Sequence, residues 1–311
     1  MSFSDHPISL HRATVVLAVG LSALASTSAA QVPNPSPSTA PGERSDKRPI
    51  LVGSLTRASL KTAPFAEWFE SQYAKYEPNR ADIDKLREPI KGLSLEAYFG
   101  TWCGDSRRQI PRLLKVLDAA GFDETRLAMV GLSGRDMEFK QSPGRPERKR
   151  LVHRTPTIVV LRGGVEIGRI VETPATTLEA DLLAMVEGHG PEPKYGAEAF
   201  VHRLFSTLSG DEALKALPAA EAEITRLSTP GSLGHYAEYD LLKNGRPAEA
   251  KALLDLHLKI DPKSVSGHVL MSEALETLGM KDEALDAVER ALALEPANAR
   301  ALKVAARLRV K

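Results

Sequence analysis

The residues of this chain best suited to chemistry surround its one cysteine, Cys103. Residues 98–113 read YFGTWCGDSRRQIPRL, in which an apolar run ends in a Trp-Cys-Gly turn and an amphipathic helical pattern follows. This order predicts that Cys103 lies at a helix N-terminus, where unpaired backbone N–H groups and the helix dipole favour a thiolate. Arg107 and Arg108 favour the thiolate further, whereas Asp105 opposes it. A thiolate attacks disulfides, so these residues point to thiol–disulfide exchange.

Helices and strands alternate around Cys103 from residue 50 to about residue 190, and this pattern predicts the frame of the site. We expect an α/β sandwich around a mixed sheet, because a strand, helix, strand unit is followed by a hairpin and a final helix. The first expected helix begins at residues 62–64, and the others cover 80–91, 105–120 and 176–186. The expected strands cover 93–99, 126–132, 157–161 and 165–170, and the last two form a hairpin across Arg162-Gly163-Gly164.

The stretch around Cys103 resembles the thioredoxin superfamily. Trp102, Cys103 and Gly104 stand where that family has its active-site turn, and Thr155-Pro156 precedes a strand further along, followed by the hairpin and the closing helix. The resemblance covers residues 50–190 and implies a thioredoxin-like α/β sandwich with a mixed sheet. It also implies that Pro156 is cis beside the sulfur and that Thr155 offers backbone hydrogen bonds to a bound peptide. The expected substrate-binding residues are therefore Trp102, Thr155 and Pro156.

The departures from that family bear on activity. Its redox turn has a second cysteine two residues after the first, and here that position is Ser106, which cannot resolve a mixed disulfide. Asp105 replaces the usual proline, and the family's buried carboxylate aligns with Ala97. Glu96 is adjacent, but strand alternation should point it to the other face. The resemblance therefore implies a monothiol site with Cys103 as its catalytic residue and a turn formed by Trp102, Gly104, Asp105 and Ser106.

The first 30 residues are typical of a signal peptide. A weakly positive start precedes an apolar core at residues 13–25, which is too short to span a bilayer comfortably, and Ser28-Ala29-Ala30 offers small residues for cleavage after Ala30. An uncleaved anchor is the alternative. Residues 31–49 are rich in Pro, Ser and charge and are expected to be a disordered linker. We therefore expect a periplasmic or secreted protein with no membrane span after cleavage.

A second linker at residues 191–197 is followed by an all-α segment, residues 198–311, with a period of 34 residues. Gly245 recurs as Gly279, Ala250 as Ala284 and Pro262 as Pro296. This spacing resembles the tetratricopeptide (TPR) repeat family. The repeats are expected at 231–264 and 265–298, with a capping helix at 299–310, and the resemblance implies binding of a protein partner. On the first helices, core packing is favoured over groove lining for Tyr236, Tyr239, His268 and Met271.

Charge and composition exclude several classes of function. The 41 basic and 40 acidic side chains give a net charge of +1, which does not favour nucleic acid as a partner. One cysteine excludes an intramolecular disulfide, and the scattered histidines indicate no metal site and no cofactor. A basic cluster lies between residues 145 and 154. It is either a solvated loop or a surface for an acidic partner, comprising Arg145, Arg148, Lys149, Arg150 and Arg154.

Three hypotheses about function remain open at this point. In the first, an exported monothiol protein exchanges thiols and disulfides with protein or peptide clients through Cys103. Glutathione or another external thiol then resolves the product, and the repeats recruit a partner. Its activity would be oxidoreductase-like or isomerase-like without a resolving cysteine. In the second, the chain is a non-catalytic binding scaffold in which Cys103 is a relic of the fold. In the third, Cys103 links two copies into a homodimer.

Overall fold

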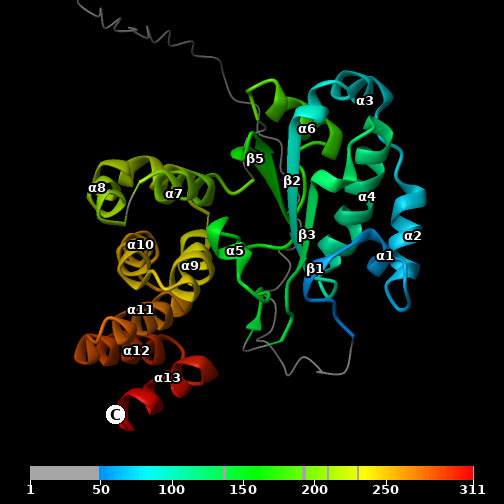
Figure 1. The fold of residues 1–311 in the computed structure, drawn as a ribbon. Coiled ribbons are helices and arrows are strands. Elements are labelled where there is room, and N and C mark those ends of the chain that lie inside the picture. Colours follow the sequence, from blue (N-terminus) through cyan, green and yellow to red (C-terminus); the bar gives the residue numbers. More distant parts are fainter. Residues whose placement is uncertain (1–48, 136–137, 191–193, 209, 230, 311) are drawn as a thin grey trace, which may run out of the picture. The chain divides into compact units, whose positions relative to one another are not determined.

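The computed structural model describes residues 49–310 except 136–137, 191–193, 209 and 230. Figure 1 shows a five-stranded mixed sheet with helices around it, followed in the chain by a series of helices. The predicted signal peptide and the first linker up to residue 48 lie outside the described residues. Within the described ranges, every helix is too short or too polar to cross a lipid bilayer.

The α/β portion contains all five strands and ends with α6. Its elements in chain order are β1 (Gly53–Leu55), α1 (Arg57–Leu60), α2 (Ala66–Lys75), α3 (Arg80–Leu86), β2 (Leu93–Phe99), α4 (Gly104–Ala120), β3 (Leu127–Gly131), α5 (Pro146–Lys149), β4 (Thr157–Arg162), β5 (Val165–Val171) and α6 (Leu178–Val186). The helix expected over 80–91 is shorter than predicted. Pro89 has no N–H to donate to the carbonyl four residues earlier, so α3 ends at Leu86 and a 3₁₀ turn, Pro89–Gly92, follows.

The sheet has the strand order β1-β3-β2-β4-β5. Central β2 runs parallel to β3 and antiparallel to β4, and β4 pairs antiparallel with β5. The hairpin between β4 and β5 turns at Gly163 and Gly164, whose φ angles of 59° and 82° favour glycine. Because β2 is central and leads directly into the turn before α4, the turn that contains Cys103 follows a strand that is paired on both sides.

Alternation along β2 sets the two faces of the sheet. Leu95, Ala97 and Phe99 join the core cluster that also holds Ile110 and Leu114 of α4. The other face carries a smaller cluster that contains Tyr98 with Val159 and Leu161 of β4. The apolar side of α4 thus packs on one face of the sheet, which fixes the N-terminal end of α4 relative to β2.

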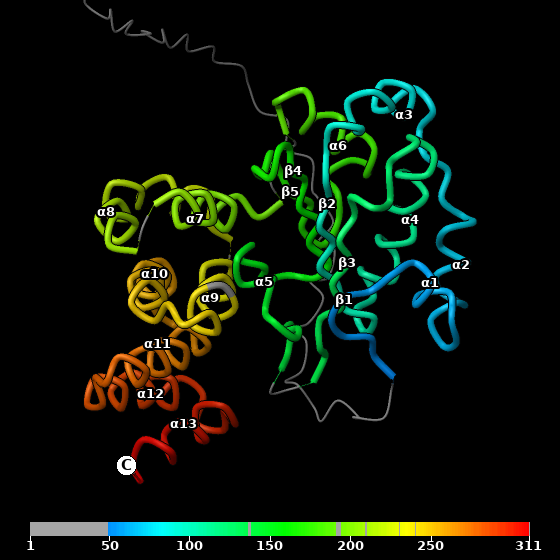
Figure 2. Tube along the Cα trace, viewed as in Figure 1, coloured from blue at the N-terminus to red at the C-terminus, as the bar shows by residue number. Residues whose placement is uncertain are grey.

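The second portion is helical throughout its described residues, and Figure 2 traces it from yellow-green to red. Its helices are α7 (Gly196–Thr207), α8 (Gly210–Leu227), α9 (Ser232–Tyr236), α10 (Pro247–Ile260), α11 (Val265–Thr277), α12 (Lys281–Leu294) and α13 (Ala299–Val310). The second linker was expected to reach residue 197, but α7 already begins at Gly196. Between α9 and α10 lie a π-helical turn, Ala237–Leu241, and a 3₁₀ turn, Leu242–Asn244.

The residues that recur at an offset of 34 take equivalent places in successive helix pairs. Gly245 and Gly279 both have a left-handed backbone, with φ angles of 75° and 79°, just after the first helical stretch of each pair. Ala250 and Ala284 are both fully buried, which allows neighbouring helices to approach closely. α10 and α12 each end two residues before a proline, because proline cannot continue the helix.

Candidate functional site

Cys103 lies at the N-terminal end of α4, as predicted. It is the N-cap residue, with extended backbone angles of −86° and 129°, and its own N–H donates to the carbonyl of Gly100 over 2.9 Å. The thiol is partly exposed. The backbone N–H groups of the first turn of α4 are those that an α-helix leaves without an intrahelical acceptor. The sulfur therefore sits where a developing negative charge is favoured.

The segment before β4 places a carbonyl beside the sulfur. The thiol of Cys103 donates to the carbonyl oxygen of Thr155, with 3.3 Å between Sγ and O. The bond between Thr155 and Pro156 is cis, as the family resemblance implied. Thr155 is 52 residues from Cys103 in the sequence, so the fold brings together two site residues that only the resemblance had linked.

Trp102 is held by the backbone around it. Its indole Nε1 donates to the carbonyl of Leu132 over 2.9 Å, and its ring lies 4.9 Å from that of Phe139 between centroids. A Cβ atom placed on Gly100 would lie 2.4 Å from the indole, and one on Gly134 would lie 2.7 Å away. Two glycines therefore leave the space in which the indole packs, next to the cysteine.

Replacing Gly100 with alanine is expected to displace this indole. A contact of 2.4 Å cannot be accommodated in place, so we expect a loss of about 1–3 kcal/mol in the free energy of unfolding and a change in tryptophan fluorescence. Gly104→Ala is the matched control, because its Cβ would have no atom within 4 Å. Equal stability and equal fluorescence of the two variants would contradict this view of the turn.

The charged side chains in the first turn of α4 form an ion pair or a hydrogen bond with nearby residues. Asp105 and Arg108 form an ion pair of 2.6 Å, which cancels much of the effect of either charge on the sulfur. Arg107 donates from Nε to the carbonyl of Thr101 over 2.7 Å. Arg107 is thus held against the turn that contains the cysteine.

Ser106 points away from solvent. Its side chain is fully buried, and its hydroxyl accepts a hydrogen bond from the N–H of Gly100 over 3.2 Å. The hydroxyl therefore ties the start of α4 to the end of β2. A buried serine in this role cannot relieve a disulfide formed at Cys103, because it offers no sulfur.

The prediction for Ala97 and Glu96 is confirmed. Ala97 is fully buried in the core beneath α4. Glu96 lies on the opposite face, where it accepts two hydrogen bonds of 2.7 Å from Arg150 and one of 2.8 Å from Tyr98. On the face of β2 that α4 covers, the position of the family's carboxylate is therefore occupied by Ala97, which has no carboxylate.

The sequence analysis missed a group of residues around Lys140. Phe139, whose ring packs at a tilt against Trp102, also lies 6.0 Å from the ring of Tyr239. Lys140 donates from Nζ to the carbonyl of His153 over 2.8 Å, and the same atom lies 4.1 Å from the centre of the Tyr239 ring. A chain of three aromatic rings therefore connects the cysteine turn with the helical portion. The one available signal was an apolar phenylalanine within a strongly charged segment.

The ammonium group of Lys140 is expected to make stability depend on pH. Burial lowers the pKa of Lys140 to about 8, and the charge of Arg154 acts in the same direction. In the unfolded chain the pKa is near 10.4. Between these values the unfolded state binds more protons, so the free energy of unfolding should rise with pH from about 8 to about 10. Chemical denaturation across this range should show the rise in the native protein and not in Lys140→Met. Parallel profiles would contradict it.

Most of the basic side chains of residues 145–154 bind groups within the fold, although Arg148 and Lys149 are exposed. Arg150 pairs with Glu96, and Arg154 pairs with Glu198 and Glu172. Arg145 pairs with Glu147, and both Arg145 and Arg148 donate to the carbonyl of Lys243. The carboxylates lie up to 54 residues away, so the sequence showed a charge run where the fold has ion pairs.

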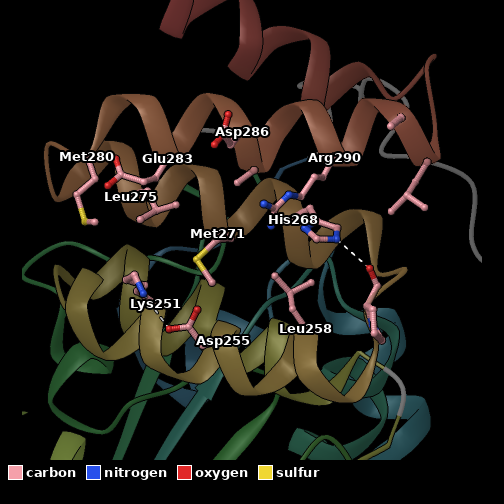
Figure 3. Close-up of a pocket in the computed structure, with 14 residues that line it drawn as sticks. Lys251, Asp255, Leu258, His268, Met271, Leu275, Met280, Glu283, Asp286 and Arg290 are labelled. Atoms are coloured by element: carbon pink, nitrogen blue, oxygen red, sulfur yellow. Dashed lines mark hydrogen bonds and ion pairs between the residues drawn. The ribbon is translucent and has the colours of Figure 1, made fainter.

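A groove in the helical portion is a second surface with features of a binding site. It has a volume of about 830 Å³ and lies among α10, α11 and α12. Figure 3 shows Met271, Leu258 and Leu275 among its apolar residues, with charged side chains around them. Lys251 and Asp255 form an ion pair of 2.9 Å on one side, and Glu283, Asp286 and Arg290 come from α12.

A search for metal-ligand clusters and comparisons with known proteins both gave no assignment for this chain. Among the residues that the structure describes, no cluster of three His, Cys, Asp or Glu side chains could hold a metal ion. Comparison with protein-family models and with curated protein sequences gave no match.

Proposed function

We propose that this protein is an exported, monothiol relative of the thioredoxin superfamily that exchanges thiols and disulfides with protein or peptide clients. The observation that carries the proposal is the position of Cys103. Its partly exposed thiol lies at the N-terminal end of a 17-residue helix and within 3.3 Å of the Thr155 carbonyl, next to a cis proline. The strand order β1-β3-β2-β4-β5 and the turn between β2 and α4 also support it.

The chemistry available to one thiol is exchange in two separate steps. In the first, the Cys103 thiolate attacks a client disulfide, forms a mixed disulfide and expels the second client sulfur as a thiolate. In the second, an external thiolate such as that of glutathione attacks the client sulfur and regenerates the Cys103 thiolate. Because Ser106 supplies no sulfur, the mixed disulfide should persist until that external thiol arrives. Thr155 and Trp102 are proposed to line the client peptide on either side.

Adduct formation tests this function directly. The purified protein is incubated with glutathione disulfide or a short peptide disulfide, and mass spectrometry under non-reducing conditions follows the mass of the intact chain. We expect one adduct on Cys103, stable until reduced glutathione is added, and none on Cys103→Ser. A native protein that forms no adduct, while the denatured protein does, would exclude exchange and favour the non-catalytic scaffold. Non-reducing electrophoresis of the same samples reports a dimer linked through Cys103.

We further propose that the helices after α6 are TPR-type repeats that recruit a partner protein. The equivalent places of Gly245 and Gly279, and of Ala250 and Ala284, support this proposal, as does the apolar groove among α10, α11 and α12. Export rests on the sequence of residues 1–30 alone, and fractionation of the producing cells tests it.

A further inference from the structure

A buried carboxylate from the helical portion is bound to the segment that faces the thiol. Glu198, in the first turn of α7, has an exposed fraction of 1%. Its Oε2 lies 2.7 Å from Nε2 of His153 and accepts from Nε of Arg154 over 2.9 Å. Its Oε1 accepts from Nη2 of Arg154 over 2.8 Å. Both carboxylate oxygens are thus used, and Arg154 is held in the bidentate geometry that guanidinium groups favour.

The two partners of Glu198 directly precede the residue beside the sulfur. His153 and Arg154 are followed by Thr155, whose carbonyl accepts from the Cys103 thiol. Arg154 is held further by Glu172 at 3.3 Å, and its guanidinium lies 3.9 Å from the centre of the Tyr195 ring. The backbone leading to Thr155 is therefore fixed through side chains of residues that come later in the chain.

The contacts of the Glu198 carboxylate with His153 and Arg154 are costly to break. Removing one partner of a buried, hydrogen-bonded ion pair leaves an uncompensated charge and is strongly unfavourable. Burial raises the pKa of Glu198, but the hydrogen bonds from His153 and Arg154 outweigh this and leave it below its usual value. The carboxylate therefore stays ionised at neutral pH, and its contacts persist there.

We propose that Glu198 is a positioning residue that holds the Thr155 carbonyl against Cys103, so that the first helix after the α/β portion shapes the thiol site. The effect of Glu198 on the reaction with clients rests on the proposed function, in which a client peptide binds to the backbone of Thr155. It requires nothing of the repeats beyond α7.

Hydrogen exchange of the backbone amides tests the positioning without reference to activity. In Glu198→Gln, the amides of Val152 and Glu172, which donate to the carbonyls of Glu147 and Pro156 on the two sides of Thr155, should exchange at least about tenfold faster than in the native protein. The amide of Ala97 in β2 reports global unfolding, and its exchange should change less than that of these two amides. Glu289→Gln is the matched control, because Glu289 makes an exposed ion pair with Arg309. Arg154→Lys keeps the cation but breaks the bidentate pair, and should act in the same direction.

A second measurement separates positioning from a loss of stability. The rate of reaction with a peptide disulfide is divided by the rate of alkylation by iodoacetamide, which needs only an accessible sulfur. We expect this ratio to fall in Glu198→Gln and to recover in part in Glu198→Asp, whereas partial unfolding would change both rates together. Unchanged exchange at residues 152 and 172 in both Glu198→Gln and Arg154→Lys would overturn the inference. Faster exchange there in a protein that never reacts with peptide disulfides would uphold the inference and reject the proposed function.

Discussion

Replacing Ser106 with cysteine is expected to turn the monothiol site into one that closes its own disulfide. Cys103 is the N-cap of α4 and residue 106 is the third residue of the helix, and these are the two positions whose side chains meet in a capping box. A thiol held this close attacks a mixed disulfide as a unimolecular reaction. We therefore expect the adduct on Cys103 to be released at least about a hundredfold faster than in the native protein.

The measurement is the lifetime of the adduct with glutathione, followed by mass spectrometry, together with the number of free thiols after oxidation. The sulfur is a weaker acceptor than the hydroxyl that it replaces, so the N–H of Gly100 loses a good partner and stability should fall by about 1 kcal/mol. Ser272→Cys is the control, because Ser272 is a fully buried serine of α11, far along the chain from the turn. If Ser106→Cys keeps two free thiols under oxidising conditions, the turn does not have the geometry that exchange requires.

The parts of the fold that were predictable are those in which local pattern and tertiary packing agree. Strand β2 has the predicted bounds because its apolar residues alternate and a turn follows directly. α4 begins within one residue of the prediction, since its apolar face repeats at the helical period and packs on β2. The 34-residue repeat likewise predicted where α10 and α12 end, because the prolines that follow have a local effect.

The surroundings of the thiol were not predictable, because they depend on contacts between distant residues. Glu198 reads as an ordinary acidic residue in the first turn of a helix, yet its partners lie 44 and 45 residues earlier. Phe139 lies between two charged residues and resembles part of a solvated loop, yet its ring packs against Trp102. No periodicity relates such pairs. Strand β1 was missed for a related reason, since three residues give too short a pattern to recognise.

Tyr236 is the residue whose truncation should destabilise the folded protein most. Its side chain is fully buried, and its ring lies 5.2 Å from that of His153 and 6.4 Å from that of His202 between centroids. This confirms the prediction that Tyr236 packs in a core, whereas His268 and Met271 of α11, although buried, line the groove among α10, α11 and α12. Since Tyr236 belongs to α9 and His153 to the segment before Thr155, the ring joins the helical core to the surroundings of the thiol.

Tyr236→Ala is therefore expected to lower the free energy of unfolding by roughly 3–5 kcal/mol, the cost of removing a buried aromatic ring and leaving a cavity. For a chain of this size the Tm should fall by roughly 10 °C. Tyr236→Phe keeps the ring and removes only the hydroxyl, so the difference between the two variants isolates the packing of the ring. Thermal unfolding followed by circular dichroism measures both. A Tm in Tyr236→Ala as high as in Tyr236→Phe would mean that the ring is not enclosed, and α9 would then not be packed against the segment that leads to Thr155.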